Sequence, residues 1–110
     1  MTPFADPHET ASYARSQWEE AEHRVARVAQ DSRRAGVLER VIDEIMYELE
    51  KRVGQTFATA ELARVWDDAE RWCLDVAHRT APEDPWAWDM SLVQGAAFFR
   101  YSRRAQDYQL

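Results

Sequence analysis

TAELARVWDDAERWCLDVAHR, residues 59–79, is the segment around which we expect the chain to be organised. Its apolar residues recur at spacings of three and four, which places them on one broad face of a helix. They are Leu62, Val65, Trp66, Ala69, Trp72, Cys73 and Val76. Thr59 is expected to cap the start of this helix, and Pro82 and Pro85 to follow its end. A helix with two tryptophans on its apolar face needs partners, so we expect other helices to pack against it.

A second helix is expected at residues 37–53, VLERVIDEIMYELEKRV, just before this segment. Its wide apolar stripe consists of Leu38, Val41, Ile42, Ile45, Met46, Leu49 and Val53, with charged residues on the other side. Gly54 suits the left-handed residue that commonly follows a helix. The short connection to residue 59 predicts that the two helices are antiparallel neighbours.

The last helix is expected at residues 90–104. Leu92, Ala96 and Phe99 share one face, which we expect to turn towards the core, while Phe98 and Tyr101 point to roughly the opposite side. Gly95 and Ala96 form a small-residue patch where another helix could approach closely.

The N-terminal part of the chain gives a weaker pattern. Residues 1–7 are expected to be a flexible tail. From residue 8 onward a narrow, mostly alanine seam of Ala11, Ala14, Trp18, Ala21, Val25 and Val28 predicts a helix that buries little area and lies at the periphery. DSRRAG, residues 31–36, favours a turn because Gly36 disfavours a helix interior, although one long helix through residues 8–53 is the alternative.

Together these patterns predict an all-α protein, a small three- to four-helix bundle with a weaker N-terminal helix. Residues 8–110 are expected to form a single helical domain, since 110 residues suffice for one modest core but not for two. Cys73, the only cysteine, lies on the apolar flank of residues 59–79 and is expected to be a buried core residue.

Composition narrows the possible functions. The net charge of −6 argues against a general affinity for nucleic acid. Thirteen of the fourteen basic residues are arginine, a composition typical of bacterial, GC-rich genomes that carries no functional weight. The first residues lack a secretory signal, and no apolar run approaches the ~20 residues of a membrane span, so we expect a cytoplasmic protein that does not interact with membranes.

No catalytic, metal-binding or cofactor-binding constellation is predicted. Glu20 with His23, and Asp75 with His78, have the spacing of metal ligands in di-iron bundles, but both histidines fall away from the apolar stripes of their helices. Ligands in a bundle core must point inward, so we expect solvated surface residues instead. Nucleophile motifs and glycine-rich phosphate loops are absent from the sequence. We therefore expect a protein that is not an enzyme.

Protein interaction is the function that these exclusions leave. The aromatic residues that do not fit the predicted core are Trp18, Trp86, Trp88, Phe98 and Tyr101, and they are interface candidates for a homodimer or a protein partner of unknown identity. Alternatively, Trp86 and Trp88 cap one end of the bundle, and Phe98 and Tyr101 contact the first helix. The second functional hypothesis is a DNA-binding regulator with a degenerate helix-turn-helix at residues 56–66, although acidic residues follow this segment.

Overall fold

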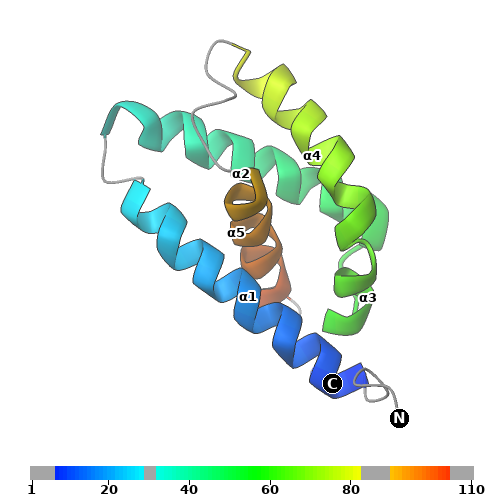
Figure 1. The fold of residues 1–110 in the computed structure, drawn as a ribbon. Coiled ribbons are helices and arrows are strands. Elements are labelled where there is room, and N and C mark those ends of the chain that lie inside the picture. The colour runs from blue at the N-terminus through cyan, green and yellow to red at the C-terminus, as the bar shows by residue number, and fades with distance from the viewer. Residues whose placement is uncertain (1–6, 29–31, 83–89, 105–110) are drawn as a thin grey trace.

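The computed structural model of the protein describes residues 7–28, 32–82 and 90–104. These residues form an all-α fold (Figure 1). Its helices are α1 (Pro7–Val28), α2 (Ser32–Val53), α3 (Thr59–Arg64), α4 (Trp66–Thr80) and α5 (Met90–Arg103). Pro7, expected in the tail, belongs to α1. Across the described residues, no helix has both the length and the apolar content that crossing a bilayer requires.

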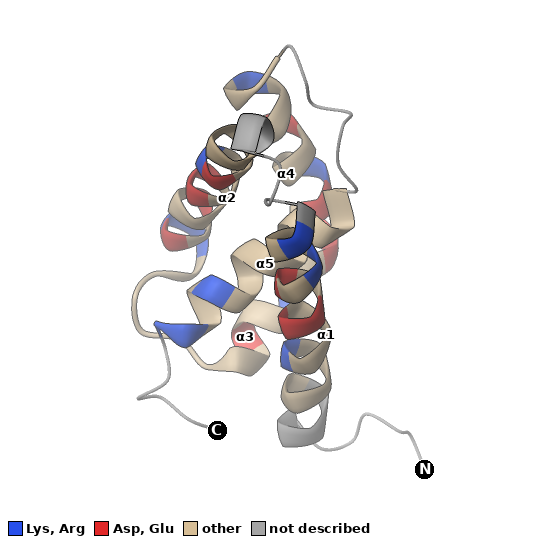
Figure 2. Ribbon diagram, turned by 90° about the vertical axis from the view of Figure 1, so that its left-hand side faces the viewer, with Lys and Arg blue, Asp and Glu red and all other residues tan. Residues whose placement is uncertain are grey.

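Helix α5 runs through the middle of the fold, with α1, α2 and α4 around it (Figure 1). It is buried on nearly every side, through Val93, Gln94, Gly95, Ala96, Ala97, Phe98, Tyr101 and Ser102. Its first ten residues carry no charge, whereas acidic and basic residues mark α1, α2 and α4 (Figure 2). A helix that is apolar all round is buried, and amphipathic helices cover it. The expectation that residues 59–79 form the centre of the fold is therefore wrong.

Phe98 and Tyr101 lie in the core, which contradicts their expected position on an uncovered side of the last helix. They are 0% and 1% exposed. The ring of Phe98 meets Trp18 of α1 edge-on, with centroids 5.4 Å apart. Tyr101 stacks on Phe57, and its hydroxyl donates to the carbonyl of Gly54 at 2.5 Å. The prediction failed because both sides of α5 are apolar, so spacing alone could not show which side is covered. For Phe98, the alternative of contact with the first helix is correct.

Helices α1 and α5 approach each other closely at Gly95. A Cβ atom placed on Gly95 would lie 2.6 Å from the Cβ of Ala21, so the contact requires glycine at this position. The prediction of a small-residue patch that admits another helix is confirmed. Helix α1 is not peripheral, because Ala11, Trp18, Ala21 and Val25 are all buried.

Helix α2 begins earlier than the sequence pattern suggests. It starts at Ser32 and continues through Gly36, so the expected turn at residues 31–36 is wrong for residues 32–36. One long helix through residues 8–53 is also wrong, because α1 and α2 are separate. The predicted apolar stripe is confirmed: Leu38, Val41, Ile42, Ile45, Met46 and Leu49 are buried and Val53 is partly so. Gly54 has the predicted left-handed conformation, with φ of 75°.

Residues 59–79 form two helices rather than one, with a break at Val65 (φ −91°, ψ 3°). Asp67 and Asp68 then occupy the first turn of α4, where negative charge is favourable. Ala58, not Thr59, is the N-cap of α3, and the Glu61 carboxylate accepts a hydrogen bond from its N–H at 3.1 Å.

The apolar face predicted for this segment is confirmed at its centre, because Leu62, Ala69, Cys73 and Val76 are buried. The buried amide of Gln94 donates to the carbonyl of Trp66 at 2.9 Å and so joins α5 to the start of α4. Helix α4 packs on α2 and runs back across it (Figure 1).

Candidate functional site

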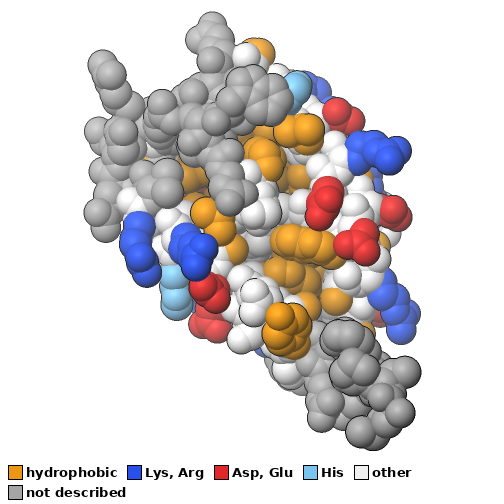
Figure 3. Space-filling view, in the orientation of Figure 1, with side chains coloured by type: hydrophobic (Ala, Val, Ile, Leu, Met, Phe, Trp, Pro, Cys, Tyr) orange, Lys and Arg blue, Asp and Glu red, His pale blue; other side chains and the backbone are white. Residues whose placement is uncertain are grey.

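A groove of about 550 Å³ opens between α1, the α3–α4 junction and the start of α5. We call it the aromatic groove. Its apolar lining comes from Ala14, Trp18, Ala21, Ala63, Trp66 and Leu92, with Gly95 beside them. Figure 3 shows apolar side chains gathered between α1 and the α3–α4 segment, with charged side chains around them. The volume falls within the roughly 300–1,000 Å³ typical of ligand-binding sites.

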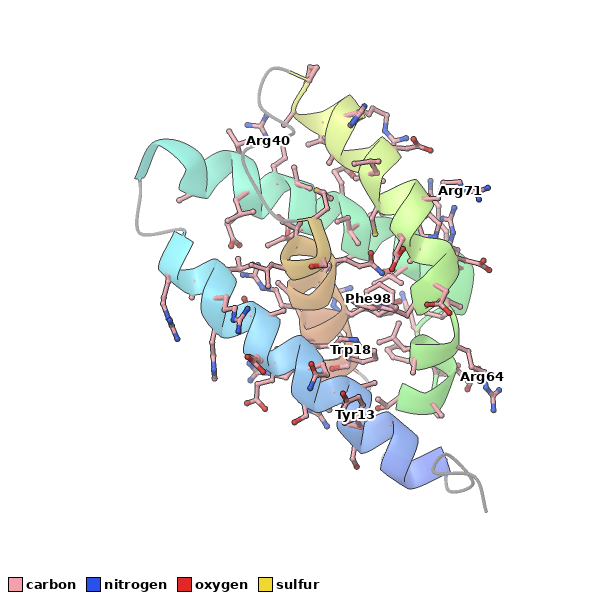
Figure 4. All side chains as sticks on the ribbon, viewed as in Figure 1. Tyr13, Trp18, Arg40, Arg64, Arg71 and Phe98 are labelled. Atoms are coloured by element: carbon pink, nitrogen blue, oxygen red, sulfur yellow. The ribbon has the colours of Figure 1, made fainter. Side chains whose placement is uncertain are left out.

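Three aromatic rings from three helices support this groove. Trp18 of α1 and Trp66 of α4 stack with centroids 6.2 Å apart and planes 20° from parallel. Phe98 of α5 meets both rings edge-on, at 5.4 Å from Trp18 and 4.8 Å from Trp66. Figure 4 shows Trp18 and Phe98 close together between α1 and α4. Such edge-on and stacked arrangements are the favoured aromatic geometries, so the three rings stabilise one another beneath the groove.

Small side chains create the open space above these rings. Ala14 and Ala21 on one wall face Ala63 on the other, and none of them reaches far across the groove. The alanine seam therefore has two effects: it lets α1 approach α5 at Gly95, and it leaves a recess beside Trp66. Tyr13, 63% exposed, stands at the rim of this recess.

Charged groups border the groove on two sides. Glu20 and Arg24 of α1 form an exposed ion pair at 3.0 Å. Asp67 of α4 borders the groove and has no ion-pair partner among the described residues. Arg64 and Arg71 point outward from the far sides of α3 and α4 (Figure 4). The groove therefore carries an excess of negative charge.

Arg100 fixes the wall that α1 contributes. Its guanidinium donates to both carboxylate oxygens of Glu22 on α1, at 2.6 and 3.0 Å, and to both of Glu39 on α2, at 2.7 and 2.9 Å. Hydrogen bonds to these two carboxylates raise the pKa of Arg100, and the hydrogen bond from Arg100 lowers the pKa of Glu39. Paired, two-point hydrogen bonds fix orientation as well as distance. Arg100 thus joins α5 to α1 and α2, which are 78 and 61 residues away in the sequence at the paired carboxylates.

The three predicted interface residues that the structure describes are buried. Trp18 is only 3% exposed, and Phe98 and Tyr101 are fully covered within the chain. Trp18 nevertheless contributes to the lining of the groove. Trp86 and Trp88 lie outside the described residues. Among the described residues that line the groove, the exposed aromatic residue is Tyr13, which the sequence reasoning missed.

Tyr13 was overlooked because it lies beside the alanine seam rather than on it. A tyrosine just off the seam of a helix is exposed at the edge of whatever that helix packs on, and tyrosine is frequent at interfaces. Trp66 was assigned to the core and is in fact only partly buried. No sequence pattern connects Tyr13 or Glu20 with Asp67, because folding alone brings α1 beside the junction of α3 and α4.

The remaining reactive groups lie away from the groove. Burial raises the pKa of the Cys73 thiol to about 12, which makes it a weak nucleophile at neutral pH, and its predicted burial is confirmed. His23 and His78 are exposed, as their helical positions predicted. Within residues 7–28, 32–82 and 90–104, no three side chains of histidine, cysteine, aspartate or glutamate gather as a metal site would require.

Comparisons of the chain with models of known protein families, with curated proteins and with solved structures gave no match. The helix-turn-helix hypothesis can be compared directly with the geometry. Only Val65 separates α3 from α4, whereas a helix-turn-helix has a turn of three to four residues. The exposed part of the first turns of α4 contains Asp67, Asp68 and Glu70, which a phosphate backbone would repel.

Proposed function

We propose that this chain is a non-enzymatic, cytoplasmic protein-interaction module, an adaptor or regulatory subunit, which binds its partner through the aromatic groove. The observation that carries the proposal is the groove itself: a preformed apolar recess above stacked tryptophans, with Tyr13 exposed at its rim. Tyrosine and tryptophan dominate interface energetics, and recesses with aromatic walls receive the anchoring side chains of a partner. Hydrophobic surface surrounded by charge is typical of protein contact sites.

The partner in this proposal is a different protein. The sequence argument for a homodimer rested on Phe98, Tyr101 and Trp18, and the burial of all three removes that argument. The proposal also assigns a role to the helix that forms one wall of the groove. In this proposal helix α1, whose seam is mostly alanine, is the intrinsically less stable wall, and its pairing with Arg100 through Glu22 holds it in place for the partner. DNA binding stays a hypothesis that no feature of α3 or α4 favours.

The test compares two exposed tyrosines. Tyr13 borders the groove, while Tyr47, 56% exposed, lies on α2 and is not part of the groove lining. The tagged wild-type chain, Tyr13→Ser and Tyr47→Ser are used as baits in native lysate, and circular dichroism checks that all three are folded. We expect one stoichiometric protein to be retained by the wild type and by Tyr47→Ser but lost with Tyr13→Ser. Equal retention by both variants, or no stoichiometric partner at all, would contradict the proposal.

A further inference from the structure

The charges around the aromatic groove indicate which kind of partner segment it accepts. Of the three charged residues that line it among those the structure describes, Glu20 and Asp67 are acidic and Arg24 is basic. Arg24 is already paired with Glu20, at 3.0 Å, so its charge is compensated. The carboxylate of Asp67 has no such partner among the described residues. A positively charged group entering the groove would therefore be attracted to Asp67.

The surroundings of Asp67 strengthen this preference. The nearest basic residues of its own segment, Arg64 and Arg71, point away from the groove (Figure 4). Asp68 and Glu70 are exposed on the same turns, and the whole chain carries a net charge of −6. Charges of one sign around a recess with apolar walls raise the local concentration of ligands of the other sign. The same field disfavours a second copy of this acidic chain as the occupant.

The apolar part of the groove selects a second feature of the ligand. Trp66 is partly buried and lies among Ala14, Ala63 and Leu92, which leave space for one large apolar side chain. Asp67 lines the same groove as Trp66, so the carboxylate and the apolar recess belong to one site. A ligand that satisfies both must carry its apolar and its basic groups close together.

We propose that the aromatic groove binds a short basic and apolar segment of a partner protein. In this segment a large apolar side chain packs on Trp66, and a neighbouring lysine or arginine pairs with Asp67. The exposed pair of Glu20 with Arg24 contributes little stability. Glu20 therefore exchanges Arg24 for a second basic residue of the segment at low cost. This inference rests on the proposed function and adds the chemistry of the partner.

The test selects peptides without assuming a natural partner. A library of random peptides displayed on phage is enriched on the purified wild-type chain, and the enriched peptides are synthesised. Their affinities are measured for wild type, Tyr13→Ser, Asp67→Lys and Asp68→Lys. Asp68 is the matched control, because it is exposed in the same first turn of α4, does not line the groove, and gives the same change in net charge.

We expect the enriched peptides to share a large apolar residue next to a lysine or arginine. Asp67→Lys is expected to weaken binding by at least about tenfold, because the charge reversal replaces the attraction to the basic residue of the peptide by repulsion between like charges. Asp68→Lys is expected to change it by no more than about threefold, through long-range charge alone. A peptide in which glutamate replaces the basic residue should bind the Asp67→Lys variant more tightly than it binds the wild-type chain.

Three outcomes would overturn the inference. Enriched peptides that depend on Tyr13 but carry no basic residue would leave the interaction function standing and refute the charge preference. Failure to enrich any peptide that depends on Tyr13 or Asp67 would count against both proposals. Self-association of the wild type that Tyr13→Ser abolishes, measured by light scattering, would place a second copy in the groove.

Discussion

The same substitution, glycine to alanine, is expected to have opposite effects at two helical positions. Gly36 lies exposed within α2, and a Cβ there would meet no atom within 4 Å. Alanine in a helix interior is favoured over glycine by about 0.5–1 kcal/mol. Gly36→Ala should therefore raise the free energy of unfolding by this amount and the Tm by roughly 2–5 °C.

At Gly95 the tertiary contact reverses the sign of the change in the free energy of unfolding. The added Cβ would lie 2.6 Å from the Cβ of Ala21, whereas packed carbon atoms lie about 3.5–4.0 Å apart. Helix α1 must then retreat by roughly 1 Å from α5, since neither atom belongs to a flexible side chain. Overpacking of this kind costs about 1–3 kcal/mol. After the gain in helix propensity, Gly95→Ala should lower the free energy of unfolding by roughly 0.5–2 kcal/mol.

Urea denaturation followed by circular dichroism measures both effects under the same conditions. Ala21→Gly provides a double-mutant cycle with Gly95→Ala, because it removes the other atom of the clash. The double variant should be more stable than the sum of the single effects predicts, by about the overpacking cost of 1–3 kcal/mol. If Gly95→Ala stabilises the protein as much as Gly36→Ala does, α1 and α5 do not approach as closely as described, and the reasoning fails.

Three further predictions concern the core, the ion pairs and the thiol. Phe98→Ala should lower the free energy of unfolding by about 3–5 kcal/mol in urea titration, since the ring is fully buried against Trp18 and Trp66. A loss near zero would contradict the burial of Phe98. The lowered pKa of Glu39 means that its pairing with Arg100 stabilises the fold fully above the ordinary value of 4.5 and progressively less as the pH falls through the lowered value. Urea midpoints measured across this acidic range should therefore depend less steeply on pH in Arg100→Met than in wild type, and an unchanged slope would show that the pair does not couple to folding. Cys73, with a pKa raised to about 12 by burial, should react with iodoacetamide only after unfolding; rapid labelling of the native protein, followed by mass spectrometry, would contradict its burial.

Local periodicity determined a large part of the fold. The stripe of α2, the apolar face that contains Ala69 and Cys73, and the left-handed Gly54 were all predictable from residues within a few positions of one another. Side chains three and four apart share a helix face whatever the helix packs against, and glycine tolerates positive φ in any context. The small-residue contact at Gly95 followed from composition in the same way.

Which helix lies at the centre of the fold became clear only from the tertiary structure. Helix α5 is uncharged on all sides before Arg100, so its sequence contains no charged face that would tell an exposed side from a covered one. The prediction consequently placed Phe98 on the surface. The break at Val65 is likewise clear only in the structure, beside the hydrogen bond that Gln94 makes to Trp66.

For the candidate site, the sequence indicated aromatic residues as the relevant chemistry but selected the wrong ones. The groove exists because α1 and α4, separated by the whole of α2, lie on either side of α5. Tyr13 and Asp67 line the same groove only because the helices pack in this way. The ion pair between Glu22 and Arg100 forms for the same reason. Helical periodicity reports on residues a few positions apart, whereas a site built from several helices depends on contacts between residues that are far apart in the chain.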